Sequence, residues 1–421
     1  MTRTTDRPSR CTGWSLLALG GLVSALTLPS GCNTVACAHG DFGSAECRVA
    51  AENHYAQVTT SSGVSLHFAE PGSDDATVVA PLGLLEPTST GVRVRPSTLM
   101  DFDLVIEAGT LGATSITLEL ENVASDAVLS LGPSGAEVEL APGMGTTRNV
   151  EVSLTDDVLW LRGRRDCPLT FRVVVAGDVQ TNPVQFERVL DSLHDELADG
   201  AATGQPLLGF ALLGDLAEVP VEEELRHVSS LLRNAVVPVS VTPGNHDVHG
   251  DVMAIYNRVF GAGTYAQAVC TAKLALFDTG AGGLAASVQA RLPELLARSS
   301  FDFLVGGGHY PAYPGRTGNS WGDEDASFYL LSELARNEAD LWVAGHYHSW
   351  EDTVPKPVGD REVRQIISGT AGASQGSGVP TFGYTRLTFS PAGLSSCFVE
   401  VLPPGRVEAQ TGTATGIRYC P

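Results

Sequence analysis

Between residues 51 and 166 the chain has the hydrophobic pattern of half-buried β-strands. Apolar and polar side chains alternate in three segments, at residues 115–121, 137–140 and 150–154. A period of two residues buries one face of a strand and exposes the other. Turn sequences separate these segments, as at Gly132-Pro133 and Pro142-Gly143. Several short strands without a helical period predict a small antiparallel β-sandwich over residues 51–166.

From residue 167 onward the pattern changes to apolar runs that alternate with helical segments. Predominantly apolar runs, typical of strands buried on both faces, occur at residues 171–176, 210–213, 236–241, 273–277, 301–305 and 341–344. Residues 183–197 have apolar side chains at the spacing of one helix face. This alternation predicts an α/β domain over residues 167–403, followed by a tail at residues 404–421.

The first 31 residues predict an export signal. Three arginines precede a 15-residue apolar run at residues 14–28, which is shorter than the ~20 residues that a membrane-spanning helix needs. The sequence Leu28-Pro29-Ser30-Gly31-Cys32 then resembles the lipobox of bacterial lipoproteins, although Pro29 stands where an aliphatic residue is usual. We expect either membrane attachment through a lipidated Cys32 or ordinary signal-peptide cleavage. The protein would be periplasmic, an outer-membrane lipoprotein or secreted, with a linker at residues 32–50.

The cysteine content is consistent with export to an oxidising compartment. Six cysteines follow Cys32, at positions 37, 47, 167, 270, 397 and 420. They allow 15 pairings, so the sequence does not fix the connectivity. Pairs within short loops would join Cys37 to Cys47 and Cys397 to Cys420, and buried free thiols are the alternative. None has the CxxC spacing of a zinc site.

Composition narrows the classes of function. Charged residues make up 18% of the chain and hydrophobic residues 43%, which is typical of a folded globular protein. The formal net charge is −22, from 48 acidic and 26 basic side chains. Nucleic-acid binding needs a basic surface, so we expect no nucleic-acid partner.

Five polar clusters directly follow apolar runs in the α/β region. They are Gly177-Asp178-Val179-Gln180, Gly214-Asp215, Gly244-Asn245-His246-Asp247, Gly308-His309 and Gly345-His346-Tyr347-His348. The carboxyl ends of strands are where open α/β sheets gather ligands. Carboxylate and amide oxygens mixed with imidazoles suit Mn, Fe, Zn or similar divalent ions. The sequence therefore predicts a metal site assembled from all five clusters.

In this order and spacing, the motifs of residues 169 to about 390 resemble the calcineurin-like metallophosphoesterases, which include purple acid phosphatases and bacterial cyclic-nucleotide phosphodiesterases. The resemblance implies a four-layer αββα sandwich. It also implies two metal ions and a metal-bridging hydroxide that attacks a phosphoester, with a histidine as the acid. By position, the first ion would be held by Asp178, Gln180 and His348, both ions by Asp215, and the second ion by Asn245, His309 and His346. His246 would be the acid, and Asp247 would orient it.

Two positions depart from the family pattern. Gln180 stands where a histidine ligand is usual, which predicts a weaker first metal site. Glu218 stands where purple acid phosphatases have a tyrosine ligand, so we expect no tyrosinate-to-iron colour.

Contacts to the substrate are less defined than the metal ligands. Arg316, in a loop rich in glycine and proline, is a candidate phosphate contact, and His249 is another; ordinary loop roles are the alternative for both. The substrate would be a small-molecule or protein phosphoester, either a monoester or a diester, and no partner of the β-domain is identified. The alternative function is a non-catalytic surface binding protein with a degenerate phosphatase domain. A nuclease is disfavoured because the sequence predicts no basic groove.

Overall fold

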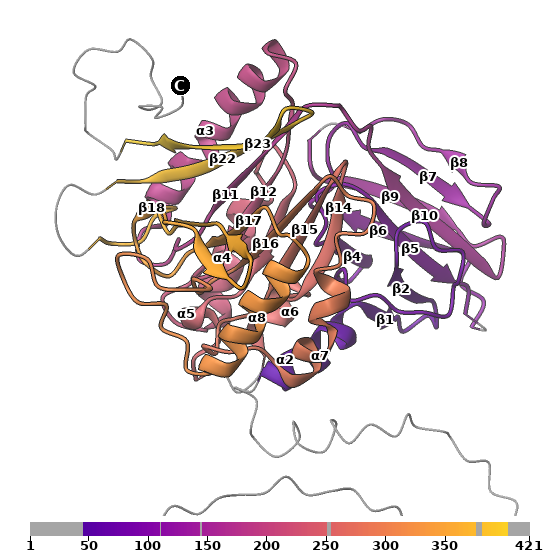
Figure 1. The fold of residues 1–421 in the computed structure, drawn as a ribbon. Coiled ribbons are helices and arrows are strands. Elements are labelled where there is room, and N and C mark those ends of the chain that lie inside the picture. Colours follow the sequence, from indigo (N-terminus) through magenta and orange to yellow (C-terminus); the bar gives the residue numbers. More distant parts are fainter. Residues whose placement is uncertain (1–44, 110, 144, 251–253, 376–380, 403–421) are drawn as a thin grey trace, which may run out of the picture. The chain divides into compact units, whose positions relative to one another are not determined.

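The computed structural model describes residues 45–402 except 110, 144, 251–253 and 376–380 (Figure 1). The export signal, the lipobox cysteine Cys32 and the tail at residues 404–421 lie outside the described residues. Among those described, no helix combines the length and the apolar character that crossing a membrane requires.

A β-sandwich occupies the first part of the described chain. Its six-stranded sheet has the order β1 (Gln57–Thr59), β2 (Ser65–Ala69), β5 (Phe102–Glu107), β10 (Val158–Arg164), β7 (Val128–Gly132), β8 (Val138–Glu139). Its four-stranded sheet has the order β3 (Gly83–Pro87), β4 (Gly91–Pro96), β6 (Ser115–Leu120), β9 (Arg148–Ser153). On β6 the alternation that predicted a strand turns Ile116, Leu118 and Leu120 into the core.

One strand pair of this sandwich differs from the antiparallel prediction. β4 and β6 pair in parallel, whereas the other pairs of the two sheets are antiparallel. The chain leaves β4, passes through β5 in the opposite sheet and returns to β6. Because of this crossover, both strands run in the same direction, a connection that side-chain alternation does not reveal.

The α/β region contains two further sheets. The first has the order β13 (Val239–Thr242), β12 (Leu207–Leu213), β11 (Phe171–Ala176), β22 (Gly383–Ser390), β23 (Gly393–Glu400). The second has the order β14 (Tyr265–Val269), β15 (Ala272–Phe277), β16 (Phe303–Gly308), β17 (Leu341–Ala344), β21 (Gln365–Ser368), β18 (Trp350–Asp352). A separate hairpin consists of β19 (Lys356–Val358) and β20 (Arg361–Val363).

Helices cover the outer faces of these two sheets, which gives the expected αββα order of layers (Figure 1). The first sheet packs against α3 (Pro183–Ala202), α4 (Glu222–Leu232) and α6 (Ile255–Phe260). The second packs against α7 (Ala286–Leu295) and α8 (Glu324–Arg336). The inner faces meet in one core, to which Val173 of the first sheet and Leu274 of the second both belong. The alternation of strands and helices in the sequence is therefore realised as four layers.

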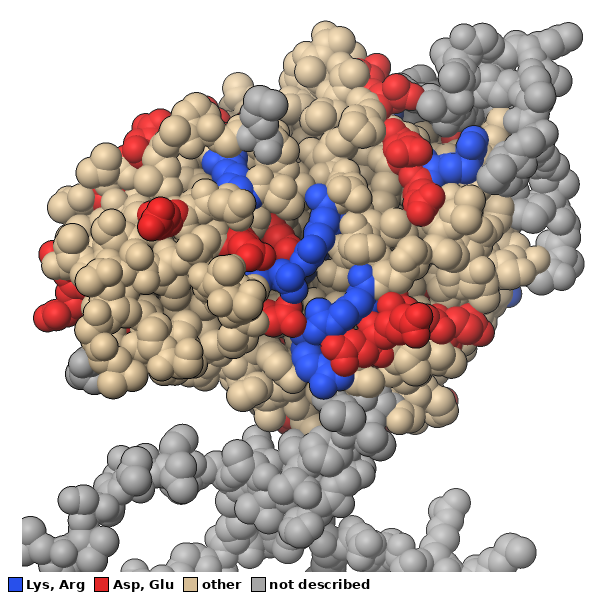
Figure 2. Space-filling view, turned by 180° about the vertical axis from the view of Figure 1, so that it is seen from behind, with Lys and Arg blue, Asp and Glu red and all other residues tan. Residues whose placement is uncertain are grey.

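The β-sandwich and the α/β region share that core and are also joined by polar contacts. The apolar cluster between the inner sheet faces continues into the sandwich. Arg226 and Arg233 near α4 form ion pairs with Glu86 and Glu121 of the sandwich, at 3.0 and 2.6 Å. On the face shown in Figure 2, basic side chains adjoin acidic ones and form no continuous basic surface. The division between residues 166 and 167 stays a prediction.

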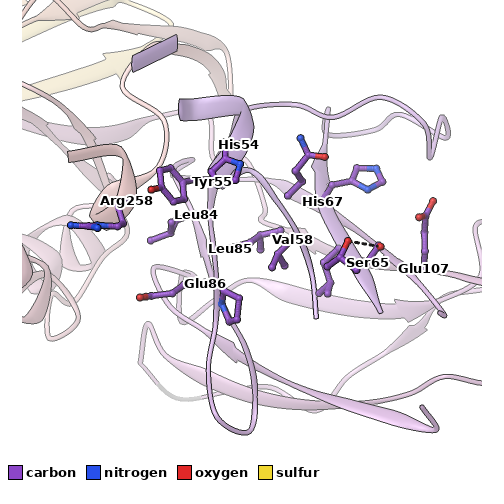
Figure 3. A pocket seen from close by; sticks show the side chains of 14 residues that line it. His54, Tyr55, Val58, Ser65, His67, Leu84, Leu85, Glu86, Glu107 and Arg258 are labelled. Carbon is purple, nitrogen blue, oxygen red and sulfur yellow. Dashed lines mark hydrogen bonds between the residues drawn. The ribbon is translucent and has the colours of Figure 1, made fainter. Parts of the chain in front are cut away.

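Helix α2 (Ala45–Tyr55) begins within the range predicted to be a linker. The sequence pattern gave no helical signal here because the inward face of α2 is polar: Arg48 and Glu52 are buried. The end of α2 lines a cavity of about 640 Å³ together with β1, β2 and β3 (Figure 3). Two charged residues at its rim, Glu86 and Arg258, are already in ion pairs with other residues of the chain.

The cysteines fall into two groups. Cys47 and Cys397 are each disulfide-bonded, and their predicted partners, Cys37 and Cys420, lie outside the described residues, so these pairings stay predictions. Cys167 and Cys270 are free thiols.

Candidate metal centre

Sharp turns after neighbouring strands bring the predicted ligands together. Asp178 follows β11 and Asp215 follows β12, and these strands are adjacent and parallel. Both aspartates, and His346 after β17, have positive φ angles of 66°, 52° and 70°. Such backbone conformations are unfavourable for residues other than glycine and concentrate at functional sites. Only glycine fits at position 214, directly before Asp215. A Cβ there would lie 2.4 Å from the backbone nitrogen of Gly244, which is closer than atoms can approach.

The second sheet contributes the imidazoles opposite these carboxylates. His309 follows β16, and Nε2 of His309 lies 3.2 Å from Oδ2 of Asp215 and 3.0 Å from Oδ1 of Asn245. Nδ1 of His346 lies 3.1 Å from the same Asn245 oxygen. Nε2 of His348 lies 3.5 Å from Oδ1 of Asp178. Ligand atoms of Asp178, Asp215 and His309 all lie within 4.8 Å of one another, a separation that one metal ion could bridge.

Two histidines are oriented by backbone carbonyl groups. Nδ1 of His309 donates to the carbonyl oxygen of Leu213 at 2.9 Å, and Nδ1 of His348 donates to that of Ser374 at 2.7 Å. With Nδ1 committed to a carbonyl oxygen, Nε2 is the nitrogen that would bind a metal ion in place of a proton. In each case Nε2 is the nitrogen that faces a carboxylate.

Two buried oxygen atoms of the cluster have no hydrogen-bond donor among the described residues. They are Oδ1 of Asp178 and Oε1 of Gln180. Their side chains are 0% and 7% exposed. Buried acceptors are normally paired, and leaving one unpaired costs about 1 to 3 kcal/mol. Together with the two oriented imidazoles, these oxygens are a donor set that fits a divalent metal ion.

The electrostatics of the cluster also fit a cation. Burial raises the pKa of Asp178 to about 8, and burial together with Asp215 raises that of Asp247 to about 7. Burial acts to lower the pKa of His309, but the adjacent Asp215 raises it to about 9. Burial and the neighbouring His309 lower the pKa of His346 to about 3. Three carboxyl groups thus share one cationic imidazole, so a divalent ion would relieve their repulsion.

The contacts of His246 and Asp247 differ from the prediction. Asp247 was expected to orient His246, but its oxygens accept the backbone N–H groups of Gly244, Leu216 and Ala217, at 2.8 to 3.0 Å. It therefore ties the turn after β12 to the turn after β13. The ring of His246 is held instead by the carbonyl oxygen of Glu218, to which Nδ1 donates at 2.7 Å. A backbone partner of this kind leaves no signal in the sequence.

The remaining predicted residues divide between the cluster and the surface. Gln180 adjoins the cluster, because its backbone N–H donates to the carbonyl oxygen of Asp215. Arg316 and His249 are exposed, and no described contact joins their side chains to the metal ligands. The sequence analysis missed Tyr310, whose ring centroid lies 4.3 Å from that of His346. Its position directly after His309 was the available signal.

Comparisons with known proteins find one family model and several solved structures that are similar to this chain. Residues 171–350 match the model of the calcineurin-like phosphoesterase family. The fold is similar to a purple acid phosphatase from yellow lupin seeds, with 12% identity, 80% of this chain and 77% of that chain covered, and a TM-score of 0.48. It is also similar to GAP50, the anchor in the inner membrane complex of Plasmodium, with 17% identity, 56% of this chain and 85% of that chain covered, and a TM-score of 0.43. For PhoD the identity is 10%, the coverage is 75% of this chain and 88% of that chain, and the TM-score is 0.44. No curated protein matches the sequence.

Proposed function

The chain belongs to the calcineurin-like phosphoesterases through residues 171–350, and we propose that it hydrolyses a phosphoester at a site that holds two divalent metal ions. The observation that carries this proposal is that Asp178, Asp215 and His309, from the turns after β11, β12 and β16, have ligand atoms within 4.8 Å of one another. Oδ1 of Asp178 and Oε1 of Gln180 are buried without a donor among the described residues. Asp178, Gln180 and His348 would hold one ion, Asn245, His309 and His346 the other, and Asp215 would lie between them.

When bound, the ions lower the pKa of water so that it can attack phosphorus, and they neutralise charge on the phosphoryl oxygens. The residues of the chain position the other groups. Because Nδ1 of His246 donates to the carbonyl of Glu218, its Nε2 is the atom that can hold a proton for the leaving oxygen. Asp247 keeps the turns of Asp215 and Asn245 at a fixed separation through its three backbone contacts.

The alternative is a surface binding protein whose phosphatase domain has lost activity, with Gln180 as the first lost ligand. The position of Gln180 favours catalysis. Its Oε1 is buried and has no donor, which is the arrangement of an amide oxygen available to a metal ion. A site in decay would not need to keep this atom unpaired at a cost in stability.

Metal content tests the proposal on the mature full-length chain. The protein is loaded with Mn, Zn or Fe, bound ions are counted by elemental analysis, and hydrolysis of p-nitrophenyl phosphate and bis(p-nitrophenyl) phosphate is measured. We expect two ions in the parent, at most one in Asp215→Asn, and loss of turnover in that variant. Asp325→Asn, at an exposed site on α8, is the matched control and should behave like the parent. No bound ion and no turnover under any loading would favour the binding-protein alternative.

A second experiment tests the role of His246. His246→Ala should lower kcat by about 100-fold for alkyl phosphates, whose leaving group needs a proton, and by much less for p-nitrophenyl phosphate. Equal losses on both substrates would remove His246 from the role of acid.

A further inference from the structure

A cavity of about 550 Å³ opens directly beside the metal cluster. It shares Gln180 and Glu218 with the rim of the cluster, and its other walls come from the start of α3, the turn after β12 and the first turns of α4. Its lining residues are Gln180, Thr181, Pro183, Leu216, Ala217, Glu218, Val221, Glu223, Glu224, His227 and Val228. We call this space the β12–α4 cavity.

One wall of the β12–α4 cavity is apolar. Its deepest part consists of Leu216, Ala217 and Val228, which are 1 to 3% exposed and packed within the protein. Val221 at the rim is 43% exposed, and its neighbour Val219 is 46% exposed. Two large apolar side chains left in water beside a catalytic centre offer contact area to an apolar part of a substrate.

The polar part of the lining contains three glutamates beside Gln180, Thr181 and His227, and it contains no lysine or arginine. Glu224 is used within the chain, because it accepts the backbone N–H groups of Glu218 and Val219 and so fixes the wall. Glu222, outside the cavity, is neutralised by Arg226 and Arg258. Glu223 is exposed and has no basic partner within 4.0 Å among the described residues. Oε2 of Glu218 lies 4.0 Å from Nδ1 of His246. The cavity therefore presents carboxylates to a ligand.

The β12–α4 cavity adjoins the place where the phosphoryl group of a substrate would lie. Gln180 belongs both to the predicted ligand set and to the cavity wall. His246 lies between the two, since its backbone N–H donates to Oδ1 of Asp215 at 2.9 Å and its Nδ1 donates to the carbonyl of Glu218, a residue of the wall. With the phosphoryl group at the cluster, this cavity is the adjoining space available to the leaving group.

We propose that this enzyme prefers phosphoesters of amino alcohols, whose alkylammonium leaving group fills the β12–α4 cavity. The inference rests on the proposed function. The alkyl part would contact Leu216, Val221 and Val228, and the cation would lie near Glu218 and Glu223. In the reaction the oxygen of water bonds to phosphorus, the bond from phosphorus to the leaving oxygen breaks, and that oxygen takes one proton to become the amino alcohol.

Two esters of the same shape separate charge from size. Phosphocholine has a quaternary nitrogen at the position where 3,3-dimethylbutyl phosphate has an uncharged quaternary carbon. Both esters release inorganic phosphate on hydrolysis. We expect kcat/KM to be at least fivefold higher for phosphocholine, since an exposed ion pair contributes about that factor. The ratio should fall in Glu223→Gln and approach one in the double variant Glu218→Gln with Glu223→Gln. Glu324→Gln, an exposed glutamate in the first turn of α8, should keep the parent ratio.

The failures of the two proposals can be told apart. Equal hydrolysis of both esters by the parent, or a ratio that does not fall in the double variant, would overturn the amino-alcohol preference while the phosphoesterase proposal stands. Hydrolysis of neither ester, together with no turnover of p-nitrophenyl phosphate and no bound metal, would overturn the proposed function.

Discussion

Two buried polar clusters of this protein both contain carboxyl groups, but only one of them supplies its carboxyl oxygens with donors from the chain. Under α2, Arg48 binds both oxygens of Asp278, at 2.5 and 3.1 Å, and Oε1 of Glu52 accepts the backbone N–H groups of Gly263 and Thr264. In the metal cluster, by contrast, Oδ1 of Asp178 and Oε1 of Gln180 have no donor.

We interpret this difference as the one between a structural cluster and a candidate ligand site. A buried charge is tolerated when a partner offsets its loss of hydration. The cluster under α2 supplies its partners from the chain, so it fastens α2 to the α/β region. The metal cluster leaves acceptors unpaired and places carboxylates side by side, which is costly for the protein alone and favourable once a cation binds.

The largest effect is expected from Asp178→Asn, which removes a proposed metal ligand. Turnover should fall by about 10,000-fold, equivalent to about 5.5 kcal/mol in the barrier. The metal-free variant should nevertheless melt no lower than the metal-free parent, because an amide avoids burying a carboxylate beside Asp215 and Asp247. Thermal melts with and without metal measure this, and the metal-induced rise in Tm should shrink in the variant. A marked loss of metal-free stability would contradict the view that the cluster is incomplete.

Removing a partner from the complete cluster should have the opposite result. Arg48→Met leaves Asp278 buried without its cation and should lower the free energy of unfolding by about 3 kcal/mol. Metal stoichiometry in the folded fraction should stay at the parent value. Urea unfolding measures the change. Arg361→Met, which breaks an exposed ion pair with Glu338, is the control and should cost less than about 1 kcal/mol.

The burial of Glu52 predicts that the free energy of unfolding depends on pH. Burial raises the pKa of Glu52 to about 8, above its ordinary value, so the folded protein keeps a proton that the unfolded chain releases. Its stabilising contribution is present below about pH 4.5 and is lost as pH rises through about 8. Glu52→Gln keeps the acceptor oxygen and should flatten the stability profile by about 2 kcal/mol between pH 5 and 8. An unchanged profile would show that another group causes the dependence.

The smallest expected effect comes from Gln180→His. An imidazole is a better ligand than a neutral amide oxygen for Zn or similar ions, so the first site should bind metal about tenfold more tightly. Competition with a chelator measures the affinity, and Thr181→Ser next to it is the control. Weaker binding in Gln180→His would mean that the geometry at this position is specific for the amide.

The sequence by itself determined most of the elements and which polar residues follow them. Apolar runs located β11, β12, β16 and β17, and the polar residues directly after them are those that the structure brings together. This worked because a buried parallel strand must be continuously apolar, and the residue after it must lie at the edge of the sheet. Residues 183–197 were also predicted correctly as helical, and Asn182 caps that helix by accepting the backbone N–H of Gln185.

Only the tertiary structure decided which atoms those residues contact. It assigned Asp247 to backbone N–H groups, gave His246 to the carbonyl of Glu218, and formed α2 where no apolar stripe marks a helix. It also opened the β12–α4 cavity, whose walls are separated along the chain. Backbone carbonyl and N–H groups are identical at every residue, so a sequence pattern records side-chain burial but not which backbone group a side chain reaches.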